Sequence, residues 1–220
     1  RHCLAASKAT NENSLVEKEL LIKEVHHRVK NNMQVISSLL SIQAEGAGDS
    51  AYSSLLNESQ QRIKSMALIH ETLYQSDDLL KIDFQEYIEL LTNSLSRSYV
   101  IPGVSVFVDV NVANVVLDLE TAVPCGLIIN ELVSNSLKHA FHDKDETGII
   151  QIDFVTDDCC FDLRIADNGS GLPAGFDLTK NTSMGLEIVT ILTGQLEGTL
   201  SADNDEGAVF QIRFPRVTNE

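Results

Sequence analysis

Residues 130–140 are Asn-Glu-Leu-Val-Ser-Asn-Ser-Leu-Lys-His-Ala, and they lie within a run that predicts a helix over 120–141. Steps of four and three place Glu131, Asn135 and Lys138 on one stripe of that helix, and His139 follows directly. Carboxylate and amide oxygens are ligands for hydrated Mg²⁺, and a nearby cation attracts phosphates. Solvated faces of surface helices have the same spacing, so this segment alone leaves both interpretations open.

Two glycine-containing segments follow this helix. The first is Ala-Asp-Asn-Gly-Ser-Gly at 166–171, where glycine lets the backbone turn sharply and approach a ligand closely. Asp167 offers a carboxylate that accepts hydrogen bonds from an exocyclic amine, although a plain tight turn has the same pattern. The second is Thr-Ser-Met-Gly-Leu-Glu at 182–187, where Gly185 lies in a first helical turn whose N–H groups favour an anion. Thr199 opens a predicted strand further on.

The residues around these segments predict a domain that mixes helices and strands. Turn residues separate runs of strong β-formers, and some neighbouring strands are close enough in sequence to form hairpins. We therefore expect a mixed sheet with helices on one face, an α/β sandwich of about 140 residues. The expected helices are 83–99, 120–141 and 184–195, and the expected strands are 104–110, 150–155, 161–165, 198–202 and 208–214.

The N-terminal third has a different pattern, which predicts two long helices. No Pro or Gly interrupts residues 15–45, the run breaks at 46–49, and a second apolar pattern continues to Leu73. Two long helices joined by a short turn form an antiparallel hairpin. Apolar steps of three and four on the first helix form a heptad seam. Its members are Ile22, Val25, Val29, Ile36 and Leu39.

This hairpin has more apolar surface than a single partner helix covers. Four flanking positions widen the apolar face, namely Leu21, Met33, Val35 and Leu40. We therefore expect a homodimer in which two hairpins form a four-helix bundle. The expected fold class is α+β, with a linker or the end of an interdomain helix at 1–14, the hairpin at 15–78 and the sandwich at 79–220.

The charge balance excludes several classes of partner. The 220 residues include 32 acidic and 16 basic side chains, which gives a formal net charge of −16. Such a protein repels a phosphate backbone, so we expect no nucleic-acid partner. No apolar run approaches the roughly 20 residues that span a bilayer, so we expect no direct membrane insertion of this segment and a cytoplasmic location. Because the sequence does not begin with Met, we expect further residues before residue 1.

The four cysteines, Cys3, Cys125, Cys159 and Cys160, lack the spacing of a metal site. Adjacent residues on a strand point to opposite faces, so we expect the side chains of Cys159 and Cys160 to be separated. All four are interpreted as small buried or half-buried hydrophobic residues in a reducing compartment.

In their order and register, the four segments that end at Gly198-Thr199 resemble the nucleotide-binding domain shared by gyrase, Hsp90, histidine kinases and MutL, the GHKL or Bergerat ATP-binding fold. The resemblance covers about residues 80–217 and implies ATP and Mg²⁺ as cofactors. It implies Asn135 as the Mg²⁺ ligand. Glu131 stands where gyrase-like ATPases have a water-activating carboxylate, and we expect a metal or structural role for it here.

The resemblance also implies which other residues contact the nucleotide. The implied contacts are Lys138 and His139 with the phosphates, Asp167 with the adenine amino group, Gly169 and Gly171 at the pocket floor, and Gly185 and Leu186 beside a lid over the phosphates. Ser183 stands at the first position of the family's Gly-x-Gly, and it is kept with Thr199 as a candidate cofactor contact. The segment between Gly171 and Gly185 is short, so we expect a small lid.

The first helix contains, at residues 24–40, the string Glu-Val-His-His-Arg-Val-Lys-Asn-Asn-Met-Gln-Val-Ile-Ser-Ser-Leu-Leu. This string closely resembles the phosphoacceptor box of the HisKA_2 subfamily of sensor histidine kinases, which is related to the HWE kinases. The family implies ATP-dependent phosphorylation of a helix histidine, followed by transfer to an aspartate on a response-regulator receiver domain.

Two adjacent histidines compete for the phosphoacceptor role. In the heptad frame His27 points away from the seam, while His26 lies beside it. A phosphoacceptor must be reached by a separate domain, so we predict His27, with His26 as the alternative. Asn31 follows His27 by four residues, which matches the His-x-x-x-Asn/Thr spacing of the wider kinase family. Arg28 stands where the largest kinase family has an acid, and Glu24 is a candidate substitute as proton acceptor.

Two other functions share part of this pattern. A degenerate phosphotransfer module would keep both domains without ATP turnover, but the residues at 135, 167, 169 and 171 that resemble the family motif disfavour it. A serine kinase of the anti-sigma type would keep only the nucleotide domain, and the long hairpin at 15–78 disfavours that alternative.

Overall fold

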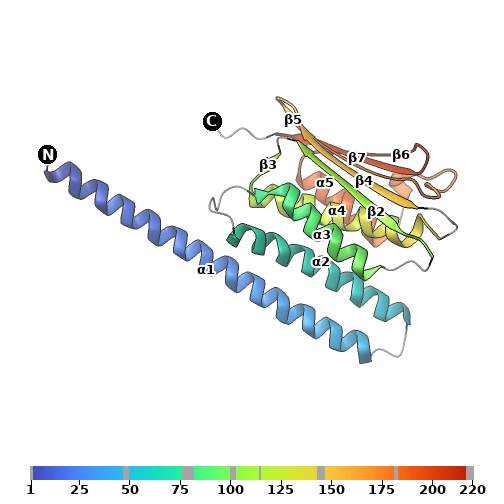
Figure 1. Ribbon diagram of the computed structural model, residues 1–220, viewed down its shortest axis with the longest axis horizontal. Helices are drawn as coiled ribbons and strands as arrows, with labels where there is room; N and C mark the ends of the chain where they lie inside the picture. Colours follow the sequence, from blue (N-terminus) through green and yellow to red (C-terminus); the bar gives the residue numbers. More distant parts are fainter. Residues whose placement is uncertain are drawn as a thin grey trace. The chain divides into compact units, whose positions relative to one another are not determined.

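The computed structural model describes residues 2–46, 50–75, 82–99, 103–113, 115–142, 147–180 and 183–216. The chain divides into two compact units, Arg1–Lys81 and Ile82–Glu220. The first unit is helical and the second combines a sheet with helices (Figure 1). Each unit is described by itself below.

The first unit is a hairpin of two long helices, α1 (His2–Gly46) and α2 (Ser50–Gln75). The helices are antiparallel, because Ser53 Oγ donates to Ala44 O beside the turn (3.0 Å), while Lys30 Nζ pairs with Glu71 Oε1 further away (2.5 Å). The first helix continues through residues 2–14, so no break separates that segment from the hairpin.

The face of α1 that packs against α2 differs from the predicted seam. Ser37 is buried and Met33 and Leu40 are half-buried, although the latter two were expected only to flank the seam. Ile36 and Leu39, both predicted seam residues, are exposed in the single chain. The seam assignment is therefore wrong for Ile36 and Leu39 in the contact within the hairpin, whereas half-buried Val29 agrees with it. A heptad pattern identifies an apolar stripe, but it does not tell which surface covers that stripe.

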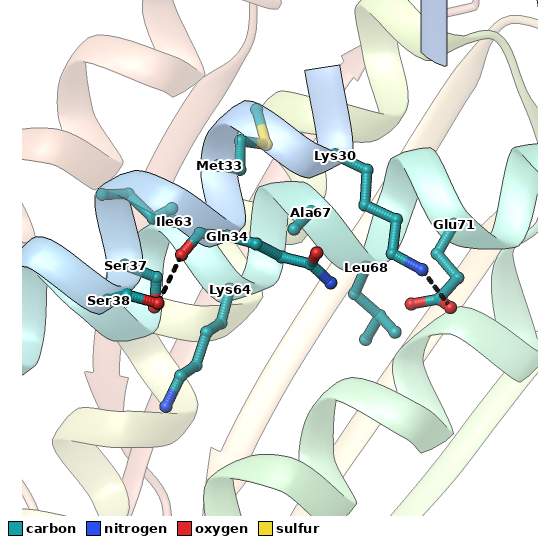
Figure 2. A pocket seen from close by; sticks show the side chains of 10 residues that line it. All are labelled: Lys30, Met33, Gln34, Ser37, Ser38, Ile63, Lys64, Ala67, Leu68 and Glu71. Carbon is teal, nitrogen blue, oxygen red and sulfur yellow. Dashed lines mark hydrogen bonds and ion pairs between the residues drawn. The ribbon is translucent and has the colours of Figure 1, made fainter. Parts of the chain in front are cut away.

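Polar groups occupy much of the space between the two helices. Gln60 Nε2 donates to Ser37 O over 3.1 Å. A cavity of about 510 Å³ lies between the helices, and Figure 2 shows the Lys30–Glu71 ion pair among its lining residues. The contact between the two helices is therefore partly polar, and α1 also keeps exposed apolar side chains outside it, such as Ile36 and Leu39.

The second unit contains a five-stranded mixed sheet with the strand order β2-β4-β5-β7-β6. The strands β2 and β4 are parallel, and the other three neighbouring pairs are antiparallel. The strand bounds are β2 Val106–Ala113, β4 Gly148–Thr156, β5 Cys160–Asp167, β6 Thr199–Asn204 and β7 Ala208–Pro215. A separate antiparallel pair, β1 (Ile82–Asp83) and β3 (Val116–Leu117), was not expected, because strands of two residues are too short for alternation to reveal.

Three helices cover one face of this sheet (Figure 1). They are α3 (Phe84–Ser98), α4 (Leu119–His139) and α5 (Met184–Gln195), and a short 3₁₀ turn, η1, spans Leu178–Lys180. Asp118 is the N-cap of the central helix α4, and its Oδ1 accepts from Thr121 N at 2.9 Å. This arrangement confirms the predicted helical hairpin followed by an α/β sandwich.

The core lies between the sheet and these helices. Alternate residues of the strands point inward, so Ile152, Leu163 and Ile212 are fully buried. Helix α4 contacts α3, α5 and the sheet, and residues 124–134 are all buried. Polar side chains in that stretch therefore need partners inside the protein.

Among the described residues, no helix has both the length and the apolar character that crossing a bilayer requires.

Candidate functional site

Asp167 is the last residue of β5, which is the middle strand of the sheet, and it is 7% exposed. Three donors fix its carboxylate. Ser136 Oγ of α4 donates to Oδ2 at 2.7 Å, and the backbone N–H groups of Gly169 (2.9 Å) and Ala208 (3.2 Å) donate to Oδ1. Each carboxylate oxygen accepts about two hydrogen bonds, so Oδ2 keeps the capacity to accept one from a ligand.

The loop after Asp167 lies directly against the end of α4. A Cβ atom on Gly169 would come within 2.3 Å of Ala140 Cβ and 2.4 Å of Ala140 O. Ser170 N donates to the same carbonyl at 2.9 Å, and Gly171 has a positive φ of 74°. Glycine is therefore required at both positions, at the first by close approach and at the second by backbone conformation.

The turn between β6 and β7 holds the same loop from the other side. A Cβ atom on Gly207 would lie 1.9 Å from Asp167 O. The side chain of Asn204 binds both backbone groups of Leu172, since Oδ1 accepts from Leu172 N (2.6 Å) and Nδ2 donates to Leu172 O (3.1 Å). On the β4 side, Asn168 Oδ1 accepts from Ile149 N at 2.8 Å. The loop is thus fixed by three separate elements.

Sequence analysis missed three residues of this arrangement, namely Ser136, Asn204 and Ala208. Each contacts the Asp167 loop from a distant part of the chain, at sequence separations of 31, 32 and 41 residues. The position of Ser136 one residue after Asn135 was a usable signal, because a hydroxyl beside a candidate ligand is available to orient a carboxylate.

A second group forms where α4 meets the start of α5. A Cβ atom on Gly185 would lie 2.9 Å from Glu131 Oε2 and 3.7 Å from both amide atoms of Asn135. Glu131 is 3% exposed, and its Oε1 accepts from Asn130 Nδ2 at 3.0 Å. A carboxylate beside the first turn of a helix is stabilised by the positive end of the helix dipole. The structure therefore brings Glu131, Asn135 and Gly185 together.

The chemistry of this group fits Mg²⁺. Its potential ligands are the carboxylate of Glu131 and the side-chain oxygen of half-buried Asn135. Within the described residues, buried Asn130 Oδ1 has no hydrogen-bond partner, so the group has further acceptor capacity for a bound water. Mg²⁺ prefers oxygen ligands and keeps several waters, so one carboxylate and one amide suffice when phosphate oxygens complete the shell.

The basic residues at the end of α4 lie beside the Asp167 loop. His139 is exposed, and its backbone oxygen accepts from Ser170 Oγ at 3.5 Å. The half-buried Lys138 directs Nζ toward the ring of Tyr99, at 5.4 Å from the centroid. The Lys138 ammonium is therefore stabilised by an aromatic face, and its long side chain can turn to a phosphate.

Two candidate cofactor residues have other positions than expected. Leu186 is buried and belongs to the core of the unit. Thr199 pairs with Arg213 on β7, whereas Asn204, beside the Asp167 loop, pairs with Ala208. Five residues of strand separate Thr199 from Asn204, which is about 16 Å. The structure therefore does not bring Thr199 to Asp167. Ser183, the N-cap of α5, is exposed and makes no side-chain cap hydrogen bond.

The predicted phosphoacceptor segment lies in the middle of α1. His27 is exposed, and its Nδ1 lies 3.4 Å from Asn31 Nδ2. Glu24 Oε1 accepts from Arg28 Nε at 2.7 Å, and this hydrogen bond and the arginine charge lower the pKa of Glu24. A carboxylate with a lowered pKa is a weaker base. The side chain of His26 lies outside the described residues.

Two family models match the chain. Residues 24–99 match the model named HisKA_2 and described as histidine kinase, and residues 120–218 match that of the histidine kinase-, DNA gyrase B- and HSP90-like ATPases. The chain belongs to the HisKA_2 histidine kinases. Together the two matches cover the predicted phosphoacceptor segment and every element that holds Asp167.

Similar proteins agree with this family. The sensor histidine kinase PdtaS of Mycolicibacterium smegmatis is 35% identical over 190 residues, which are 85% of this chain and 37% of that protein. PdtaS of Mycobacterium tuberculosis is 34% identical over 208 residues, 92% of this chain and 40% of that protein. The chain thus spans about two fifths of the length of these curated relatives.

A solved structure shares the fold of both units. The histidine kinase domain from Erythrobacter litoralis EL346 blue-light activated histidine kinase superposes with a TM-score of 0.65 and 24% identity, and the match covers 88% of this chain and 92% of that one. At this identity the similarity supports the fold alone. It covers the helical unit as well as the unit that contains the sheet.

Proposed function

We propose that this chain is the catalytic core of a two-component sensor histidine kinase. It transfers the γ-phosphoryl group of ATP to His27 and then to an aspartate of a response-regulator receiver domain. The observation that carries the proposal is the fixation of Asp167, whose carboxylate is buried, held by three donors and still able to accept from a ligand amine. Such a preorganised acceptor matches the amino group of adenine.

The second group of side chains would bind the phosphates and the metal. Asn135 is the proposed Mg²⁺ ligand, with Glu131 beside it, and the first turn of α5 at Ser183 and Gly185 offers N–H groups to phosphate oxygens. Lys138 adds positive charge at the end of α4, and the ring of His139 adds a hydrogen-bond donor. When bound, Mg²⁺ neutralises charge that builds up on the phosphates.

His27 supplies the nucleophile. A nitrogen with a free lone pair attacks the γ-phosphorus in line, so an N–P bond forms while the P–O bond to ADP breaks. The contact between Asn31 and His27 Nδ1 supports a positioning role for Asn31. With Nδ2 facing Nδ1, as in the structure, Nδ1 accepts from Asn31. A half-turn of the Asn31 amide instead presents its oxygen to Nδ1–H, and the lone pair of Nε2 is then available to attack. The Nδ1 proton then leaves to water or to Glu24, once Glu24 releases Arg28.

A homodimer is proposed through the outer face of α1. Six apolar side chains between 47% and 66% exposed lie there, namely Leu21, Val25, Val35, Ile36, Leu39 and Ile42. A contiguous apolar face of this kind on one helix is the usual interface of a four-helix bundle. The free thiols among the described cysteines fit the reducing cytoplasm proposed as the location.

ATP binding tests this proposal against a degenerate phosphotransfer module. Asp167→Asn keeps the shape of the side chain but presents an amide where a carboxylate accepts, so we expect ATP affinity and γ-phosphoryl incorporation to fall by about tenfold or more. The matched control is Asp162→Asn, five residues earlier on β5, where the carboxylate binds exposed Gln211. Thermal unfolding of both variants separates lost binding from lost folding. Unchanged ATP affinity in folded Asp167→Asn protein would contradict the proposal.

A further inference from the structure

The turn between β4 and β5 brings two thiols and a carboxylate together. Cys159 Sγ lies 3.3 Å from Cys160 Sγ and 3.2 Å from Asp157 Oδ1. The ligand atoms of the three residues lie within 4.8 Å of one another. Across the described ranges, no other group of three His, Cys, Asp or Glu side chains is this compact. This corrects the expectation that the two cysteine side chains are separated. The expectation that both are buried or half-buried is wrong for Cys159, which is exposed, and correct for half-buried Cys160.

The two side chains converge because Cys159 lies in the turn and only Cys160 belongs to the strand. Backbone hydrogen bonds fix the turn. Asp157 Oδ1 accepts from Cys159 N (2.9 Å) and Cys160 N (2.7 Å), Asp157 N donates to Cys160 O (3.0 Å), and Arg216 N donates to Cys159 O (2.9 Å). The relative positions of the three side chains are thus set by the hairpin itself.

The spacing fits a tetrahedral thiophilic cation. Metal–sulfur bonds of about 2.3 Å and a metal–oxygen bond of about 2.1 Å put tetrahedral S···S and S···O edges near 3.8 and 3.6 Å. The observed 3.3 and 3.2 Å are within about half an ångström of these edges, so small side-chain rotations would open the site around an ion. Sulfur ligands favour soft or borderline cations and disfavour Mg²⁺.

The charges around the turn also balance. Two thiolates and one carboxylate carry three negative charges, and a divalent cation leaves one. Arg213 Nη2 lies 3.1 Å from Asp157 Oδ2 and offsets that remaining charge, while Oδ1 faces the thiols. The exposure of Cys159 gives an ion access from solvent and leaves the fourth position to water.

We propose that the β4–β5 turn binds a divalent thiophilic cation of the zinc and cadmium class through Cys159, Cys160 and Asp157. Both thiols lose their protons to solvent as the two metal–sulfur bonds form, and no oxidant or reductant takes part. Seven residues of β5, about 23 Å, separate Cys160 from Asp167. The site is therefore distinct from the candidate nucleotide site and does not depend on kinase activity.

Titration of the full chain with Cd²⁺ tests this site, in buffer with a phosphine reductant that keeps the thiols free and does not itself supply thiol ligands. We expect one equivalent of Cd²⁺ to bind, with a thiolate-to-cadmium charge-transfer absorption in the ultraviolet. Cys159→Ser and Cys160→Ser should each lose most of this absorption. Cys3→Ser is the matched control, because it removes a cysteine elsewhere in the chain and should keep the charge-transfer absorption.

Asp157→Asn tests the third ligand. Asparagine keeps an acceptor oxygen for the two N–H groups of the turn but loses the charge. We expect Cd²⁺ affinity to fall by about tenfold or more, with the charge-transfer absorption retained at saturation. Three outcomes would overturn the proposed site. The first is no absorption in the wild-type chain at excess Cd²⁺, and the second is the full absorption in the Cys159→Ser/Cys160→Ser double variant. The third is unchanged Cd²⁺ affinity in Asp157→Asn.

Discussion

Ser136 Oγ donates a 2.7 Å hydrogen bond to Asp167 Oδ2, and both side chains are buried. This contact joins the central helix α4 to the last residue of β5 and sets the orientation of the carboxylate. A hydrogen bond to a buried charged group contributes more to the free energy of folding than one between neutral groups. Its loss leaves the buried charge without a partner in place of water.

The first prediction concerns this contact. Ser136→Ala removes the donor but leaves Asp167 buried, so we expect the free energy of unfolding to fall by about 2 kcal/mol. Urea denaturation measures the change. Ser94→Ala, at an exposed position on α3, is the control and should shift the unfolding free energy by less than about 0.5 kcal/mol. Equal effects of the two substitutions would show that the contact with Asp167 contributes nothing.

The second prediction compares two glycines. Gly169→Ala places a Cβ atom 2.3 Å from Ala140 Cβ, so the loop must move and we expect a loss of about 3 kcal/mol of stability together with weaker ATP binding. Gly194→Ala on α5 meets nothing within 4 Å and should stabilise the protein by about 0.5–1 kcal/mol, because alanine favours the helix. Thermal and urea unfolding measure whether the first substitution lowers the stability and the second raises it. A tolerated Gly169→Ala would contradict the close approach.

The third prediction concerns pH. The hydrogen bond from Arg28, and its charge, lower the pKa of Glu24. A depressed folded-state pKa means that the contribution of this ion pair is present above the ordinary glutamate pKa and is lost as pH falls through the lowered value. Arg28→Ala should therefore raise the Glu24 pKa toward its ordinary value in an NMR titration of the carboxyl carbon. An unchanged titration midpoint would show that the ion pair does not persist in solution.

The fourth prediction concerns assembly. Leu39→Glu places a charge on the apolar outer face of α1, so we expect the dimer to dissociate at micromolar concentration. Light scattering coupled to size-exclusion chromatography gives the mass. Gln34→Glu, which adds the same charge at an exposed polar position on another side of the helix, should leave the dimer intact. A monomeric wild-type chain would contradict the proposed homodimer.

Local patterns were enough to predict much of this molecule. Alternating apolar residues predicted β4, β5 and β7, because inward-facing residues such as Ile152 and Ile212 repeat with the period of the strand. The sharp turn expected at Gly171 is present because its positive φ is a property of the loop itself. The need for glycine at Gly169 comes instead from its close approach to Ala140. The string at 24–40 is contiguous in sequence, so it was enough to indicate the HisKA_2 family.

Features that depend on distant contacts could not be predicted. Thr199 was assigned to the nucleotide site from its place in the motif order, but strand register decides which end of β6 lies beside Asp167. Ser136 contacts Asp167 across the core, which no local pattern reveals. The cysteine pair was misjudged because both residues were treated as strand residues, whereas Cys159 lies in the turn and only Cys160 belongs to β5.

The central claim is that His27 receives the phosphoryl group. The most direct measurement is incubation of the chain with Mg²⁺ and γ-labelled ATP, followed by acid and alkali treatment of the labelled protein. We predict label that acid removes and alkali does not, as expected for a phosphohistidine. The label should persist in His26→Ala and disappear in His27→Ala. Undiminished label in a folded His27→Ala variant would contradict the claim.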